Sequence, residues 1–114
     1  MSRRLWLTCP MGTAEWRIYV APPSDPALTP DGQECHAVTL TDSCEIVISD
    51  TVHPSRRAEM VVHELLHAAV AVSGLGVTQR WGDAREEVVV RALAGPLAHA
   101  LVGSGLWRGR RVPR

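Results

Sequence analysis

The sequence contains no lysine, no phenylalanine and no asparagine, and its formal net charge is zero. All 12 basic residues are arginine, and 12 acidic residues balance them. This balance argues against a protein that binds nucleic acid or an anionic membrane through its overall charge. Codons for lysine, phenylalanine and asparagine are all A/T-rich, so their joint absence indicates a GC-rich genome. The abundance of arginine is therefore no signal for nucleic-acid binding.

Long apolar runs are also absent, and none approaches the roughly 20 residues that span a bilayer. The apolar stretch after Arg3 and Arg4 stops at Pro10, and it is shorter than the core of roughly 7–15 residues in a secretory signal peptide. The chain has an odd number of cysteines, three, and no CxxC pair, which predicts reduced thiols. We therefore expect a cytoplasmic protein that makes no contact with a membrane.

The length and composition indicate one small folded domain. The chain has 114 residues, of which 46% are hydrophobic, and a chain of this size buries roughly two-thirds of its unfolded surface. We expect residues 1–114 to form a single domain. Within it we expect mainly strands and a loop in residues 1–50, two helices in residues 55–102 and a basic tail in residues 108–114.

The first half has the pattern of a small, mainly antiparallel sheet. Runs rich in β-branched and aromatic residues predict strands at residues 4–8 and 16–20. A loop with four prolines follows at residues 21–32. Residues 36–40 and 45–49 alternate apolar and polar side chains, which predicts a hairpin.

The second half changes to helical periodicity. Apolar residues recur every three or four positions between Ala58 and Val72 and predict a helix with Ser55 as its N-cap. Gly74 suits the left-handed end of this helix. A second helix is expected to begin near Asp83 and to kink or break at Pro96, because proline lacks the backbone donor.

The first helix carries the motif His63-Glu-Leu-Leu-His67. Helical residues four positions apart lie on one face, so both imidazoles can bind one zinc ion. Glu64 then lies beside the metal rather than on it, where it can act as the general base for a zinc-activated water. The motif predicts a zinc-dependent metallopeptidase.

A catalytic zinc usually has three protein ligands, and the second helix offers two candidates for the third. The helical stripe of Glu86 is apolar and is expected to face the first helix, which favours Glu86. Its further members are Val90, Leu93 and Leu97. Glu87 shares its stripe with Arg91 and two alanines and is the alternative ligand. Glu86 also fits a capping box that starts at Asp83, which is a structural role for the same side chain.

In these two stretches the chain resembles small zinc metallopeptidases of the gluzincin type. The similar residues are His63-Glu-Leu-Leu-His67-Ala-Ala69 and Glu86-Glu87-Val-Val-Val-Arg-Ala-Leu-Ala94. They look most like minigluzincins, ImmA/IrrE-like proteins and short HELLHA-type proteins of phages and prophages. The resemblance implies a zincin-like α+β fold, in which a sheet packs on the motif helix and a second helix donates a glutamate. It also implies ligation by His63, His67 and either Glu86 or Glu87, with Glu64 as the base.

Two functions stay open from the sequence. The first is hydrolysis of a peptide or protein substrate that pairs with the strand at residues 44–49. The alternative is a zinc-stabilised, catalytically weak module of the same fold that binds a peptide or protein. Neither function involves nucleic acid directly or a membrane, and the oligomeric state is left open. His53 and Tyr19 are further candidates as hydrogen-bond donors to a reacting oxygen.

Overall fold

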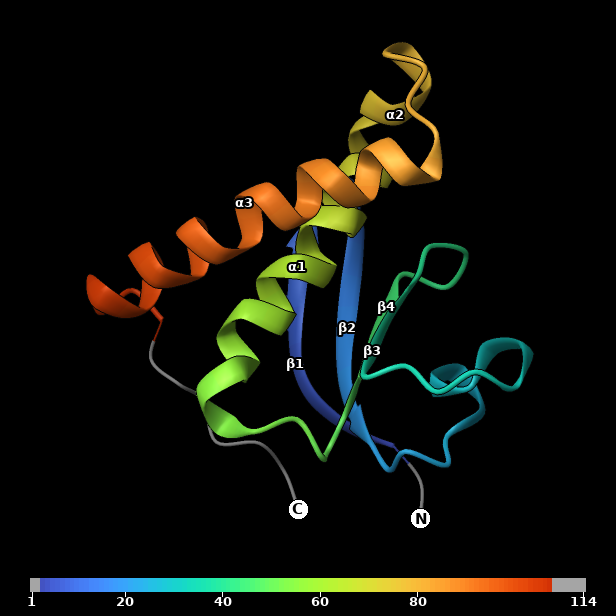
Figure 1. The fold of residues 1–114 in the computed structure, drawn as a ribbon, viewed down its shortest axis with the longest axis vertical. Helices are drawn as coiled ribbons and strands as arrows, with labels where there is room; N and C mark the ends of the chain where they lie inside the picture. The colour runs from blue at the N-terminus through green and yellow to red at the C-terminus, as the bar shows by residue number, and fades with distance from the viewer. Residues whose placement is uncertain (1–2, 108–114) are drawn as a thin grey trace.

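The computed structural model describes residues 3–107, which form a four-stranded sheet and two long helices (Figure 1). This α+β arrangement confirms the expected fold class. The strands are β1 (Arg4–Met11), β2 (Ala14–Ala21), β3 (Ala37–Leu40) and β4 (Glu45–Ser49). The helices are α1 (Pro54–Ser73), the single turn α2 (Leu75–Thr78) and α3 (Asp83–Gly103), and two 3-10 turns, η1 (Pro26–Leu28) and η2 (Pro30–Gly32), lie in the proline-rich loop. The predicted basic tail at residues 108–114 lies outside the described residues.

The strand order is β1-β2-β4-β3. The β1–β2 and β3–β4 pairs are antiparallel and the β2–β4 pair is parallel, so the sheet is mixed with mainly antiparallel pairing. Strand β4 is paired on both of its edges, which commits its backbone hydrogen bonds to β2 and β3. The expectation that a peptide pairs with residues 44–49 is therefore wrong. The outer strand on this side of the sheet is β3.

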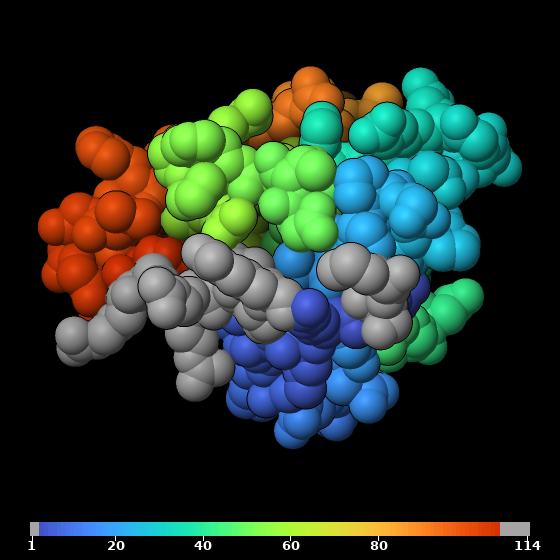
Figure 2. All heavy atoms as spheres, turned by 90° about the horizontal axis from the view of Figure 1, so that it is seen from below, coloured from blue at the N-terminus to red at the C-terminus, as the bar shows by residue number. Residues whose placement is uncertain are grey.

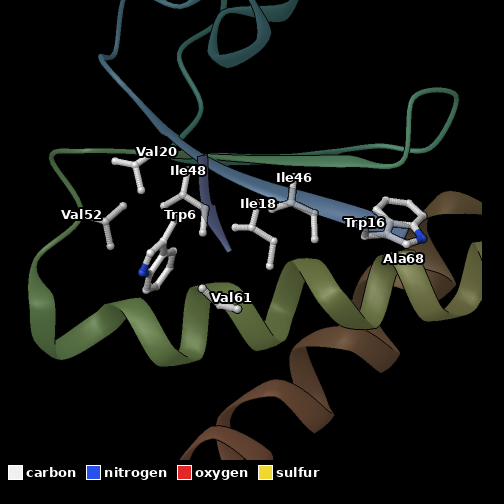
Figure 3. Packing of buried hydrophobic residues seen from close by; sticks show 9 residues of the cluster. All are labelled: Trp6, Trp16, Ile18, Val20, Ile46, Ile48, Val52, Val61 and Ala68. Atoms are coloured by element: carbon white, nitrogen blue, oxygen red, sulfur yellow. The ribbon is translucent and has the colours of Figure 1, made fainter. Parts of the chain in front are cut away.

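One face of the sheet packs against α1 (Figure 3). Successive side chains of a strand point to opposite faces, and alternate residues of β2 and β4 enter this core. Its buried members are Trp6, Trp16, Ile18, Val20, Ile46, Ile48, Val52, Val61 and Ala68. Tyr19 lies between two of these residues on β2, so its ring points away from α1, where it packs 5.7 Å from the Arg3 guanidinium carbon. Tyr19 is therefore no donor to the motif on α1.

Helix α3 covers the side of α1 that faces away from the sheet (Figures 1 and 3). Its contact with α1 uses small side chains, because Ala94 and Ala98 pack with Val62. Small residues at a helix contact allow the two axes to approach closely. The larger Leu93 and Leu97 are instead 47% and 43% exposed.

The buried residues of α3 are Val90, which belongs to the predicted stripe of Glu86, and Ala94 and Ala98, which share the stripe of Glu87. The prediction that Glu86 lies on a stripe whose leucines face the first helix is wrong. The prediction ranked the two faces by how apolar they are. Close helix packing instead buries the small Ala94 and Ala98 and leaves Leu93 and Leu97 partly exposed.

The N-terminus of α1 is capped by a histidine. Nδ1 of His53 accepts a hydrogen bond from the backbone N–H of Ser55 at 3.2 Å, and Pro54 occupies the first turn. Proline suits that position because its missing N–H has no helical partner there. The prediction of Ser55 as the N-cap is wrong by two residues. His53 precedes His63 by about 15 Å of helix, so it is too distant to act at the motif. Gly74 ends the helix in the predicted left-handed conformation, with φ of 69°.

Helix α3 departs from two expectations. Gly82 is its N-cap and no side chain caps it, so the predicted capping box from Asp83 to Glu86 does not form. The helix also continues through Pro96 to Gly103 without the expected break. Pro96 is exposed, so water can reach the carbonyl that lacks a donor there.

The chain beyond α3 returns to the core. Trp107 packs edge to face on Trp6, with ring centroids 6.2 Å apart. The end of α3 projects on one side of the molecule, and the segment around residues 26–36 lies on the opposite side (Figure 2). No helix within residues 3–107 combines the length and the apolar character needed to cross a membrane.

Candidate metal centre

His63 and His67 stand one helical turn apart on α1, and their ring centroids are 5.0 Å apart. Their side chains are 21% and 18% exposed, so each ring is half-buried with one side accessible. The neighbouring turns of α1 bury Val61 and Ala68 against the sheet. The amphipathic pattern of α1 thus fixes both rings at the border between the core and α3.

Glu87 of α3 bridges the two rings. Its Oε1 lies 3.0 Å from Nε2 of His63, and its Oε2 lies 3.1 Å from Nε2 of His67. One ligand atom from each of the three residues lies within 4.8 Å of the others. The structure therefore brings together His63, His67 and Glu87 as a group that could hold a metal ion.

Glu86 lies on the other side of His67. Its Oε2 is 2.6 Å from Nδ1 of that ring, the nitrogen that faces away from Glu87. The adjacent carboxylates of α3 thus contact opposite nitrogens of one imidazole. The sequence favoured Glu86 as the third residue of the group, whereas the structure places Glu87, the alternative, between the two histidines.

Charged neighbours keep Glu87 ionised. Burial opposes ionisation, but a hydrogen bond from Nε of Arg91 at 3.0 Å and the charges around the carboxylate together lower the pKa of Glu87 below its ordinary value. Those charges belong to His63, His67 and Arg91. An ionised carboxylate between two imidazoles is the form that binds a cation.

Glu64 is the buried carboxylate of the motif. It is 6% exposed, and its Oε1 accepts a hydrogen bond of 2.8 Å from the hydroxyl of Thr39 on β3. Its Oε2 lies 3.9 Å from Nε2 of His63. Burial raises the pKa of Glu64, while the Thr39 hydrogen bond and the two motif histidines act in the opposite direction.

Thr39 is the residue that sequence reasoning missed. Ala37 and Thr39 share the face of β3 that meets α1, since Ala37 packs against the main core and Thr39 contacts Glu64. The alternation of β3 was visible in the sequence. Nothing in a single threonine indicates a partner 25 positions later, because that contact depends on how the strand lies across the helix.

The donor set fits a metal ion such as zinc. Two imidazole nitrogens and one carboxylate are the protein ligands of several catalytic zinc sites, at bond lengths of about 2.0–2.2 Å. Tetrahedral ligands at such lengths lie about 3.4 Å apart, and the two contacts of Glu87 are 3.0 and 3.1 Å. Nitrogen and oxygen donors also suit other transition metals, so the group indicates a metal site without selecting the ion.

Comparison of the chain with protein-family models, curated proteins and solved structures finds no match.

Proposed function

We propose that this chain is a zinc-dependent metallopeptidase with a gluzincin-like site. The observation that carries the proposal is the placement of Glu64, whose Oε2 lies 3.9 Å from Nε2 of His63 and beside the group completed by His67 and Glu87. A metal site without a catalytic role does not require a buried carboxylate next to its ligands.

In this proposal His63, His67 and Glu87 hold the zinc ion. When bound, zinc supplies the positive charge that polarises a peptide carbonyl and lowers the pKa of water beside it. Glu86 orients His67, because a proton on Nδ1 that is donated to Glu86 leaves the lone pair of Nε2 for the metal. Arg91 holds Glu87 through its hydrogen bond.

Glu64 acts as the general base. Its Oε1 is held by Thr39, which leaves Oε2 to accept a proton from the attacking water. The same oxygen then delivers that proton to the nitrogen of the departing amine. Burial raises the pKa of Glu64, and a base whose pKa is closer to neutrality both accepts and returns a proton effectively.

The substrate is a peptide or an extended protein segment that lies along β3. This strand ends the sheet on the side of Glu64, so its outer edge can pair with an extended chain. Pairing there brings a peptide bond next to the Glu64 carboxylate. Strand β4, the strand first expected to do this, has no edge to offer.

The test is the substitution Glu64→Gln in the zinc-loaded protein. It keeps the shape of the side chain and removes the base, so the variant should retain one zinc per chain and lose hydrolysis of fluorescein-labelled casein. Glu34→Gln is the control, because Glu34 is exposed and lies outside the described site. Absence of bound zinc in the parent protein at neutral pH would contradict the proposal.

The alternative function is a zinc-stabilised module that binds peptides with little turnover. It is favoured by the small size of the protein, in which α3, the helix that carries Glu87, packs on α1 through few apolar side chains. In that case the parent protein and Glu64→Gln should bind zinc and peptide equally, and neither should cleave casein.

A further inference from the structure

An open cleft of about 510 Å³ adjoins the candidate metal centre on the side of His63. Three elements line it, namely the chain at the start of β3, the first half of α1 and the middle of α3. His63, Glu64 and Glu87 are among the residues that line it. A peptide that places a bond beside Glu64 must therefore direct some of its neighbouring residues into this space.

Two arginines line the cleft beyond the metal centre, Arg56 on α1 and Arg91 on α3. Arg91 uses Nε to hold Glu87 and is 75% exposed, so the rest of its guanidinium stays accessible. The Arg56 side chain has no hydrogen bond or ion pair with any residue from 3 to 107. Glu59 also lines the cleft and lies within ion-pair distance of neither arginine.

The positions of these arginines define which substrate residues they reach. Arg91 is one helical turn from Glu87, and Arg56 is two turns before His63, about 10 Å along α1. An extended peptide advances about 3.3–3.6 Å per residue. Arg56 and Arg91 therefore lie within the length of about three extended residues from the metal centre.

A second cleft is lined by Glu86, the carboxylate that contacts Nδ1 of His67, and its charges balance. It measures about 500 Å³ and contains one arginine, Arg80, and one carboxylate, Glu86. Its other walls include Val70, Val77 and Trp81.

The cleft beside His63 is lined by two arginines and also by three carboxylates, Glu59, Glu64 and Glu87. Glu64 and Glu87 belong to the candidate metal centre, so beyond that centre the arginines outnumber the carboxylates. We therefore expect a substrate carboxylate to bind on the His63 side.

We propose that the cleft beside His63 binds a carboxylate of the peptide substrate through Arg56 and Arg91. Guanidinium groups bind carboxylates with paired, charge-assisted hydrogen bonds, which give both geometry and affinity. The inference rests on the proposed peptidase function and names its substrate class, a peptide with a carboxylate within three residues of the scissile bond. The carboxylate belongs either to the C-terminus of the peptide or to an aspartate or glutamate side chain.

The kinetic test compares three forms of one peptide. The first has a free C-terminus and the second an amidated C-terminus. The third is amidated and has glutamate, in turn, at each of the three residues that follow the scissile bond on the side of the cleft. The zinc-loaded protein should cleave at least one carboxylate form with kcat/KM about tenfold above the neutral amide. Arg56→Ala should reduce the ratio of kcat/KM for the carboxylate form to kcat/KM for the amide towards one, through KM. Arg85→Ala is the matched control, because Arg85 is exposed and lines neither cleft.

A binding test separates this inference from the peptidase function. Zinc-loaded Glu64→Gln is titrated with the same peptides, and the carboxylate forms should bind about tenfold more tightly than the amide. Equal binding of all forms by Glu64→Gln overturns the carboxylate inference even if peptides are cleaved. The inference is also overturned if the double variant Glu64→Gln/Arg56→Ala binds the carboxylate forms as tightly as Glu64→Gln does. Carboxylate-selective binding without any cleavage supports the cleft and contradicts the peptidase. Preference for the free acid identifies the C-terminus, and preference for a glutamate amide identifies the side chain.

Discussion

The imidazole of His67 has a carboxylate on each of its nitrogens, with Glu86 at 2.6 Å from Nδ1 and Glu87 at 3.1 Å from Nε2. Consecutive residues of α3 therefore contact one ring from two sides. Glu87 points between the two histidines, in the group that could hold a metal ion, and Glu86 contacts the second nitrogen of His67. In the proposed site Glu87 is the ligand, and Glu86 sets the orientation and the proton of His67. A histidine ligand is commonly held in this way by a carboxylate on its second nitrogen.

This division of tasks predicts unequal effects on zinc binding. Glu87→Ala removes a ligand and should abolish stoichiometric binding at neutral pH. Glu86→Gln leaves all three ligands in place and should weaken zinc affinity about 10- to 100-fold, because it removes the charged partner of His67. Competition with a chromogenic chelator measures both effects.

The matched control for these variants is Asp83→Asn, which alters an exposed carboxylate in the first turn of α3. It should bind zinc as the parent does. If Glu86→Ala lost zinc completely while Glu87→Ala kept it, the assignment of the two glutamates would have to be exchanged.

Thr39 is predicted to support turnover without supporting the metal. Thr39→Val keeps the shape of the side chain and removes the hydrogen bond to Oε1 of Glu64, so kcat should fall about tenfold. KM and zinc content should stay unchanged, and Thr39→Ser should restore kcat. Steady-state kinetics and metal analysis test this, and zinc loss in Thr39→Val would contradict it.

The contact between α1 and α3 predicts that enlarging a buried alanine of α3 lowers the stability of the fold more than truncating a leucine of the same helix. Ala98→Leu forces a large side chain into the closely packed contact with Val62 and should lower the free energy of unfolding by about 1–3 kcal/mol. Leu97→Ala alters a residue that is 43% exposed and should cost less than about 1 kcal/mol. Urea unfolding measures both, and a greater cost for Leu97→Ala would show that the other face of α3 packs inward.

Asp25 is predicted to make the fold sensitive to acid. Its carboxylate accepts hydrogen bonds of 2.9 and 3.1 Å from the guanidinium of Arg3. The Arg3 hydrogen bonds lower the pKa of Asp25 below 3.8, and the backbone N–H of Ala27 acts in the same direction against burial. Because the folded-state pKa is the lower one, this contribution is complete above the unfolded value and disappears as the pH falls through the folded value.

Asp25→Asn should therefore lower the free energy of unfolding by about 1–2 kcal/mol at neutral pH. The difference from the parent should vanish in strong acid, where both side chains are neutral. Asp42→Asn, at an exposed turn residue, serves as the control. A difference between parent and Asp25→Asn that did not change with pH would show that the charge of Asp25 is not what stabilises the fold.

Local patterns predicted those parts of the molecule that depend on neighbours in the chain. The spacing of His63 and His67 predicted a shared helical face, and the alternation of residues 45–49 predicted a strand. The choice between Glu86 and Glu87 failed because it depends on how closely two helices pack, and alanines rather than leucines decided that distance. The role of Thr39 and the parallel pairing of β2 with β4 arise from contacts between distant segments, for which the sequence has no local signal.

The contact through which Ala94 and Ala98 hold α3 on α1 also determines how readily α3 detaches by local unfolding. Local opening costs least where few apolar side chains are buried, and α3 buries only Val90, Ala94 and Ala98. Because Glu87 belongs to α3, each opening of this helix withdraws it from His63 and His67. Amide hydrogen exchange along α3 should therefore report directly on disassembly of the metal centre. Zinc that binds only the closed state should slow exchange in α3 in proportion to its occupancy, while the amides of β2 and β4 exchange through global unfolding.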